Sequence, residues 1–274
     1  MKNMGKHVVI TGGSSGIGKA VAIRFAQEGW NLSLISRDEI KLKSALSEIR
    51  KHCSNPQQKI LSYPADVSDE QALTQAIQHA VTVNGFPDML ITSAGVACAD
   101  YFQNLTGAGF KRTMDINYFG TLNAVRAIYP YMRDAHKGHI VMIASASGLF
   151  GTFGYCAYSP SKFAVRGLAE SLRPEFKQLG INLSIVFPPD TDTPQLQEEE
   201  LTRPEEAKRI IGTVKPWPAD KVADCIMRGI RKKQFHITPG FPIWFLRFAH
   251  SVIFRVLNCY FDSLLKSPKR SNLL

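Results

Sequence analysis

His7-Val-Val-Ile-Thr-Gly-Gly-Ser-Ser-Gly-Ile-Gly18 is the stretch that decides the fold. Its first five residues form a short, mainly apolar run that ends at a glycine, which is typical of a buried β-strand. Residues 19–28 then repeat apolar side chains with helical spacing. A glycine-rich turn therefore joins a strand to a helix. Such a turn lets backbone approach a phosphate, and the helix N-terminus supplies free N–H groups and the positive end of a dipole.

The glycine spacing is G-x-x-x-G-x-G and differs from the G-x-G-x-x-G of the standard dinucleotide fingerprint. A pattern this loose also occurs in ordinary structural turns. Its position directly after a strand favours a phosphate site. We therefore expect a cofactor to contact Gly12, Ser14, Ser15, Gly16, Ile17 and Gly18.

Strands and helices alternate along the following sequence. We predict strands at residues 32–35, 59–63, 88–92, 138–145 and 181–187, and helices at 40–50, 70–83, 110–135 and 158–179. This alternation predicts the α/β class, as a single Rossmann-type, doubly wound parallel sheet. Ligands bind such sheets at the carboxyl ends of the strands. Arg37, Asp66, Val67 and Gly95 fall at these ends and join the expected cofactor site.

Arg37 follows the second predicted strand, where a doubly wound sheet receives the adenosine ribose. An acidic side chain there would accept a hydrogen bond from the ribose 2′-hydroxyl, whereas an arginine pairs with a 2′-phosphate. The alternative is a solvated arginine at a helix start, and Asp38 beside it carries the opposite charge. We expect NADPH/NADP rather than NAD.

Tyr158 and Lys162 lie four residues apart in a predicted helix, so both side chains share one face. A nearby ammonium lowers the pKa of a phenol, which is otherwise a weak acid and base at neutral pH. Ser145, at the end of the preceding strand, adds a hydroxyl that can hold an oxygen atom. The spacing also arises by chance in surface helices. Its place at the ligand-binding edge indicates acid–base chemistry at a carbonyl or carbinol.

The composition limits the type of protein. A chain of 274 residues can form one large domain with a full core. Only residues 1–6 precede the first strand, without a segment of signal-peptide length, so we expect a cytoplasmic protein. Five widely spaced cysteines predict reduced thiols rather than a disulfide framework or a zinc site.

The C-terminal region carries most of the net charge of +10: residues 226–274 contain nine Lys or Arg and one acid. No apolar run in 241–265 reaches the roughly 18–20 residues of a spanning helix. On a helix, polar residues would form one stripe opposite a broad apolar face: Arg247, Ser251, Arg255, Asn258 and Asp262. We expect peripheral membrane contact through 241–265. The alternative is packing on the domain or on a second subunit. Nucleic acid is not expected, because no recognition motif is present.

These features in this order resemble the short-chain dehydrogenase/reductase family over residues 6–235. Thr11, Gly12, Gly16 and Gly18 match its cofactor turn. The catalytic tetrad of the family is matched by Asn117, Ser145, Tyr158 and Lys162. The resemblance implies hydride exchange between a nicotinamide and a carbonyl carbon. It implies that Tyr158 passes the proton and Ser145 holds the substrate oxygen. Lys162 would bind the nicotinamide ribose and lower the tyrosine pKa, and Asn117 would anchor a water in the proton relay.

Two motifs depart from the usual family pattern. Thr92-Ser93-Ala94-Gly95 replaces Asn-Asn-Ala-Gly, and Pro188-Pro189 replaces a Pro-Gly turn beneath the nicotinamide. Residues 187–194 and 158–169 instead resemble 3-ketodihydrosphingosine reductases. Those enzymes use NADPH to reduce the C3 ketone of a long-chain base in sphingolipid biosynthesis. The resemblance therefore implies a lipid-like substrate, 3-ketodihydrosphingosine (3-dehydrosphinganine), and dihydrosphingosine as product.

The segment after the sixth predicted strand lies at the nicotinamide end of the expected site. We assign Thr191 and Thr193 to the cofactor. A 3-keto long-chain base carries an ammonium next to its ketone, and we expect Asp190, rather than Asp192, to pair with it. The alternative is that both aspartates cap the following helix.

Residues 195–212 are predicted to form a mobile lid that excludes water. The acidic run Glu198-Glu199-Glu200 within it is expected to be solvated and to have no chemical role. We expect residues 1–238 to form the NADP-binding domain with this lid, and 239–274 to form an amphipathic basic extension. The family resemblance also implies a homo-oligomer.

Two other interpretations remain open at this point. One keeps the chemistry but changes the substrate to a steroid, a retinoid or another hydrophobic carbonyl or alcohol. The other is a cofactor-binding regulator without turnover, against which the intact tetrad argues.

Overall fold

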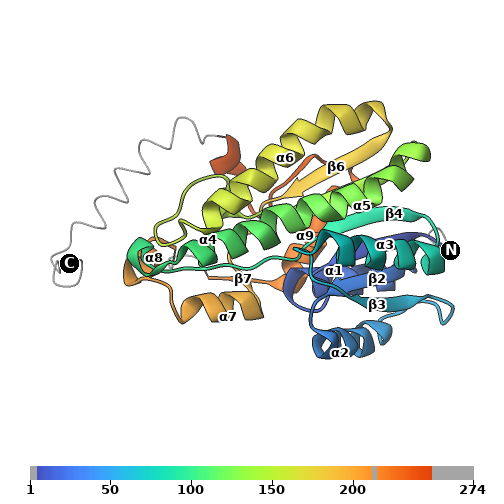
Figure 1. Cartoon of the computed structure of the whole chain (residues 1–274), viewed down its shortest axis with the longest axis horizontal. Helices are drawn as coiled ribbons and strands as arrows, with labels where there is room; N and C mark the ends of the chain where they lie inside the picture. The colour runs from blue at the N-terminus through green and yellow to red at the C-terminus, as the bar shows by residue number, and fades with distance from the viewer. Residues whose placement is uncertain (1–4, 212–214, 249–274) are drawn as a thin grey trace.

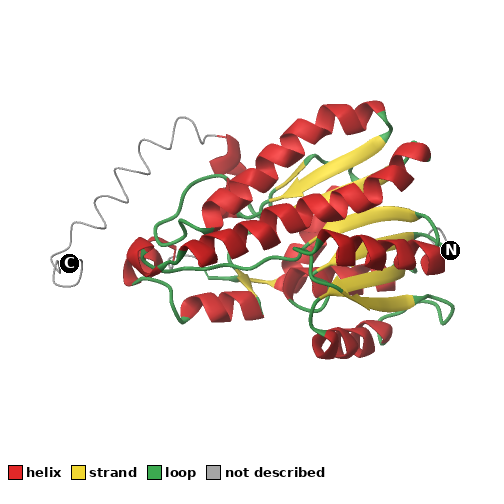
Figure 2. Cartoon of the chain, viewed as in Figure 1, coloured by secondary structure: helices red, strands yellow, loops and turns green. Residues whose placement is uncertain are grey.

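A seven-stranded parallel sheet forms the centre of the computed structural model, which describes residues 5–211 and 215–248. The strand order is β3-β2-β1-β4-β5-β6-β9, with helices on both faces (Figures 1 and 2). The strands are β1 (His7–Thr11), β2 (Asn31–Ser36), β3 (Ile60–Pro64), β4 (Pro87–Thr92), β5 (Gly138–Ile143), β6 (Ile181–Val186) and β9 (His236–Ile237). The predicted doubly wound sheet is confirmed.

Each strand alternates its side chains between two hydrophobic cores. In β1, Val8 and Ile10 join one core and Val9 joins the other, and the whole strand is buried. This pattern is expected of a parallel sheet covered on both faces. The first core is closed by α1 (Gly16–Gln27), α2 (Glu39–Arg50) and α9 (Ala219–Arg231). The second is closed by α3 (Glu70–Asn84), α5 (Gly120–Asp134) and α6 (Tyr158–Gln178).

The helix predicted at 110–135 contains a local irregularity. It begins as α4 (Gly107–Met114), widens into a π-helical turn at Asp115–Phe119, and continues as α5. Single π-turns inside helices are often found at functional sites. Here the turn carries Asn117, one of the predicted catalytic residues.

Short elements cover the carboxyl edge of the sheet. The predicted lid consists of α7 (Pro194–Glu200) and α8 (Glu205–Ile211), which lie at the same end of the molecule as α4 (Figure 1). The other short elements there are the paired β7 (Thr191–Asp192) and β8 (Trp217–Pro218) and two 3-10 turns, Phe102–Asn104 and Ala146–Gly148. Of these segments, β7, α7 and the Ala146–Gly148 turn contribute residues to the wall of the predicted site.

Residues 241–248 form a helix that follows β9. Ile243 and Leu246 pack against the core, while the other side carries exposed aromatic rings. Those rings stack on one another and belong to Phe241, Trp244, Phe245 and Phe248. The rest of the predicted polar stripe, from Ser251 onward, lies outside the described residues. Within 5–211 and 215–248, no helix is both long enough and apolar enough to cross a membrane.

Candidate active site

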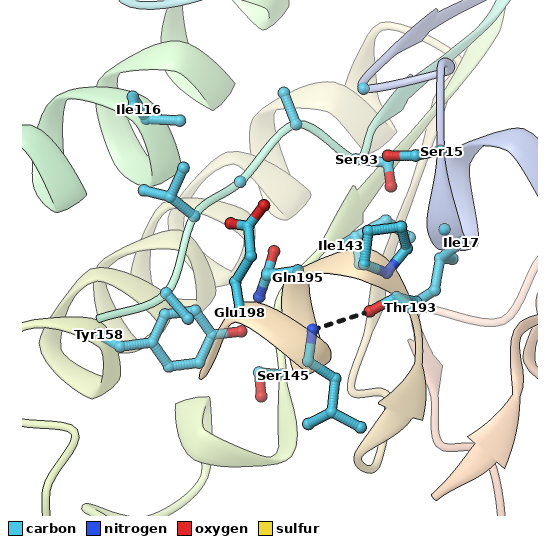
Figure 3. Close-up of a pocket in the computed structure, with 18 of the residues that line it drawn as sticks. Ser15, Ile17, Ser93, Ile116, Ile143, Ser145, Tyr158, Thr193, Gln195 and Glu198 are labelled. Carbon is cyan, nitrogen blue, oxygen red and sulfur yellow. Dashed lines mark hydrogen bonds between the residues drawn. The ribbon is translucent and has the colours of Figure 1, made fainter. Parts of the chain in front are cut away.

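A cavity of about 470 Å³ lies across the carboxyl ends of the central strands. Its position is the topological switch point between β1 and β4, where ligands of doubly wound sheets bind. Figure 3 shows Tyr158, Ser145 and Gln195 on one side of it and Ser15, Ile17 and Ser93 on the other. All the predicted site residues line this cavity except Gly18 and Asn117, which lie behind its wall.

The glycine turn has the shape needed to hold a diphosphate. Gly12 has a φ of 70°, and a Cβ there would lie 2.6 Å from the backbone nitrogen of Ala94. A side chain at Gly18 would collide with the carbonyl oxygen of Gly12. Helix α1 starts directly behind this turn, with no acid in its first turn and no side-chain cap. Its free N–H groups and the close backbone therefore fit the diphosphate of a dinucleotide.

The adenosine end of the cavity contains two cations, together with Asp38 and Asp66. Arg37 and Lys41 line it, and the Oγ of Ser14 donates to the Oγ of Ser36 at 3.0 Å beneath them. Asp38 also lies there, but its Oδ1 accepts the backbone N–H of Lys41 at 2.9 Å and caps α2. The carboxylate next to Arg37 is therefore already engaged in the helix cap through one of its oxygens.

Tyr158 and Lys162 start α6 and are both buried. The Lys162 Nζ lies 5.6 Å from the centroid of the Tyr158 ring and donates to the carbonyl of Ile143 at 3.2 Å. Burial raises the pKa of Tyr158, and the charge of Glu199 raises it further, while the nearby hydroxyl of Ser145 lowers it. Burial lowers the pKa of Lys162 to about 8. The pair therefore combines a protonated phenol with an amine that titrates near neutral pH.

Asn117 is fully buried behind the same site. Its Oδ1 accepts the N–H of Val96 at 2.8 Å, and its Nδ2 donates to the carbonyl of Val96 and the hydroxyl of Ser161 at 2.9 and 2.8 Å. A Cβ at Gly95 would lie 3.2 Å from the Asn117 Oδ1 and 3.5 Å from the Lys162 Nζ. The structure thus brings the four predicted catalytic residues together, and Asn117 ties the loop after β4 to α6.

Glu199 contradicts the expectation that residues 198–200 are solvated. Its side chain is buried and lines the cavity. The hydroxyl of Tyr155 donates to its Oε2 and the amide of Gln195 donates to its Oε1, both at 2.9 Å. Gln195, Glu199 and Arg203 are spaced by four residues, as on one face of a helix, although α7 itself ends at Glu200; this spacing was the missed indication.

Arg203 is the cation within this acidic wall, and its side chain is only 3% exposed. It pairs with Glu200 at 2.7 Å, Asp190 at 3.4 Å and Glu199 at 3.5 Å. Asp190, which we predicted to bind a substrate ammonium, lines the cavity and is held in place by this guanidinium. Sequence reasoning did not find Arg203, Gln195 or Tyr155.

Comparisons with known proteins add an independent line of observation. A family model described as short chain dehydrogenase matches residues 6–204. A 3-ketodihydrosphingosine reductase of Bos taurus is 40% identical over 237 residues, covering 86% of this chain and 71% of the relative. A 3-dehydrosphinganine reductase of Danio rerio is 40% identical over 236 residues, with the same two shares.

Solved structures give the same fold at lower identity. Levodione reductase superposes with a TM-score of 0.78 at 24% identity, covering 86% of this chain and 95% of that chain. NAD+-bound xylitol dehydrogenase gives a TM-score of 0.79 at 22% identity, covering 88% and 100%. At such identities the likeness establishes the fold.

Proposed function

Because this chain belongs to the short-chain dehydrogenase family, we propose that it uses NADPH to reduce the 3-keto group of 3-ketodihydrosphingosine to dihydrosphingosine in sphingolipid biosynthesis. The observation that carries the proposal is the joining of Ser145, Tyr158 and Lys162 to the glycine turn in one cavity. The substrate is inferred from the two relatives of 40% identity reported above, both of which bear this activity in their names. A regulator without turnover would not need the intact tetrad.

The chain's own residues account for the proton chemistry. Ser145 and the hydroxyl of Tyr158 hold the ketone oxygen and orient the carbonyl carbon towards the nicotinamide position. A bound NADPH supplies the hydride. Tyr158 gives its proton to the oxygen as the alcohol forms, and its raised pKa keeps that proton available at neutral pH. The Lys162 ammonium stabilises the phenolate that remains. Asn117 holds the loop after β4 against α6 through its hydrogen bonds to Val96 and Ser161.

We infer NADPH rather than NADH from the charge at the adenosine end. Arg37 and Lys41 supply two cations at the rim of the cavity, and Asp38 is engaged as a helix cap. A 2′-phosphate would gain charge-assisted hydrogen bonds there. At the nicotinamide end, Thr191 and Thr193 line the cavity and are assigned to the carboxamide.

Peripheral contact with a membrane, on its cytoplasmic face, is a second part of the proposal. The exposed stack of Phe241, Trp244, Phe245 and Phe248 supports it, together with Arg228, Lys232 and Arg247 around a neighbouring hollow. Aromatic rings beside basic groups suit the interface of an anionic bilayer. A lipid substrate would reach the enzyme from such a surface.

We also propose that α7 and α8 open as a lid, that residues 1–238 form the catalytic domain with 239–274 as its extension, and that the protein is a homo-oligomer. The lid proposal is supported by the position of α7 across the cavity. Light scattering of the purified protein tests the assembly, and a monomer at micromolar concentration would contradict it.

The function is tested by NADPH oxidation with purified protein. 3-Ketodihydrosphingosine and a steroid ketone are offered in parallel micelles, with Tyr158→Phe as the inactive control. We expect turnover of the long-chain base and none in the variant. If only the steroid ketone were reduced, the proposed substrate would be wrong. If Tyr158→Phe oxidised NADPH as fast as the wild type, the proton-donor role of Tyr158 would be contradicted.

A further inference from the structure

The inner face of α7 places a nitrogen between the acid–base hydroxyl and a buried carboxylate. Gln195 and Glu199 are one turn apart, and the Gln195 Nε2 donates to the Glu199 Oε1 at 2.9 Å. The same amide lies next to the hydroxyl of Tyr158 and lowers the pKa of that phenol. Figure 3 shows Gln195 next to Tyr158 and Ser145 in the cavity. An N–H donor is thus held beside the position of the reacting oxygen.

The wall around this donor carries more negative than positive charge. Arg203 serves three carboxylates, and its shortest ion pair, 2.7 Å, is with Glu200, which is 46% exposed. Its distances to Asp190 and Glu199 are 3.4 and 3.5 Å. Charge-assisted hydrogen bonds are typically about 2.7–2.9 Å long. Asp190 and Glu199, the two carboxylates that line the cavity, are therefore bound less closely by Arg203 than Glu200 is.

We propose that Glu199 binds the ammonium group next to the substrate carbonyl, so that the enzyme selects 2-amino ketones over plain ketones. The inference rests on the proposed function. The ketone oxygen takes the place of the Gln195 amide at Tyr158 and Ser145. The ammonium, on the adjacent carbon, takes the place of the same amide at the Glu199 Oε1. One amino ketone can thus replace both contacts that the amide makes.

Glu199 suits this role better than its neighbours. Among the charged groups, Glu199 raises the pKa of Tyr158 the most, followed by Asp190. Its Oε2 is already fixed by the Tyr155 hydroxyl, which leaves Oε1 directed to Gln195. Asp190 is hydrogen-bonded to Arg203, so it would act on the substrate ammonium through its charge rather than through direct contact. Burial of a carboxylate is costly unless a cation compensates it, and a substrate ammonium supplies that compensation.

Glu199→Gln tests the inference, because glutamine keeps the shape and removes the charge. The measurement is kcat/KM for 3-ketodihydrosphingosine and for the 1-hydroxy-3-ketone of equal chain length that lacks the amine. We expect the variant to lose roughly 10- to 100-fold on the amino ketone and less than about threefold on the analogue. Equal losses on both would overturn the inference.

Glu200→Gln is the matched control. It makes the same charge change on the same helix and also touches Arg203, but Glu200 does not line the cavity. The ratio of the two kcat/KM values should remain that of the wild type. A shift as large as that of Glu199→Gln would attribute the effect to Arg203 and overturn the inference.

The wild-type enzyme supplies a measurement that does not depend on folding of a variant. It should prefer the amino ketone to the analogue at least about tenfold. Equal reduction of both ketones would contradict ammonium binding and leave the reductase function intact. Failure to reduce the amino ketone, with NADPH bound and another ketone reduced, would contradict the proposed function itself.

Discussion

The hydroxyl of Tyr155 donates a 2.9 Å hydrogen bond to the Oε2 of Glu199, so the turn before the catalytic helix holds the helix that covers the cavity. The Tyr155 ring also packs with Tyr158 and with Ala207 of α8. The catalytic tyrosine and the lid therefore share one small apolar cluster. We therefore expect a change in the lid to alter the position of the Tyr158 hydroxyl.

Tyr155→Phe should loosen the lid. The buried Glu199 carboxylate loses one donor, which costs about 1–3 kcal/mol. We expect a lower melting temperature and a KM for the ketone raised several-fold, with NADPH affinity unchanged. Tyr131→Phe is the control, because it makes the same change in α5, outside both the lid and the cavity. An unchanged KM in Tyr155→Phe would show that the bond does not hold the lid closed.

Reduction should slow at alkaline pH. The pKa of Lys162 is lowered to about 8, so its ammonium is present below that pH and lost above it. Loss of the ammonium removes the charge that stabilises the Tyr158 phenolate. We expect kcat/KM for reduction to be level below pH 7 and to fall above about pH 8. Lys162→Arg keeps the charge, so its residual activity should not show this decline. A wild-type profile that stays level to pH 10 would contradict the role.

Arg37→Ala should reduce discrimination between the cofactors. Losing one charge-assisted contact at an exposed rim should lower kcat/KM for NADPH roughly tenfold and leave NADH nearly unaffected. Lys43→Ala removes a cation from the same helix region outside the cavity, where Lys43 pairs with Glu39. It should change neither value. If Arg37→Ala lowered kcat/KM equally for NADPH and NADH, Arg37 would not contact the 2′-phosphate.

Gly18→Ala should damage the cofactor turn. The added methyl would collide with the Gly12 carbonyl, and overpacking of this kind costs about 1–3 kcal/mol. We expect a lower melting temperature and weak NADPH binding, measured by cofactor fluorescence. Gly167→Ala is its control: it lies exposed in α6, has nothing within 4 Å of an added Cβ, and should stabilise the helix by up to about 1 kcal/mol. Normal NADPH affinity in Gly18→Ala would contradict the proposed fit.

The sheet could be predicted because each of its six longer strands is a short apolar run bounded by turn residues. β1 has the predicted bounds, and the others begin or end within two residues of them. The two-residue β9 could not be found this way. It pairs with β6 through only two register positions and has no pattern of its own. The π-turn at Asp115–Phe119 was also missed, since the apolar spacing does not report a single widened turn.

The catalytic residues could be placed because each follows a strand or starts a helix at a fixed distance along the chain. The burial of Glu199 beside Arg203 could not be predicted from the sequence in the same way. Glu199 belongs to an acidic run, a pattern that is usually solvated, whereas in the fold it contacts Tyr155, 44 residues away, as well as Gln195 and Arg203, each four residues away. Composition alone does not separate Glu199 from Glu198, which is exposed.

Transfer of deuterium from NADPH labelled at nicotinamide C4 to the substrate carbon tests the central claim most directly. The purified protein is incubated with labelled NADPH, of either face, and 3-ketodihydrosphingosine, and the product is analysed by mass spectrometry. We predict one deuterium at C3 of dihydrosphingosine from one of the two labelled forms, and no labelled product with Tyr158→Phe. Absence of labelled dihydrosphingosine from the wild-type protein with both forms would contradict the account.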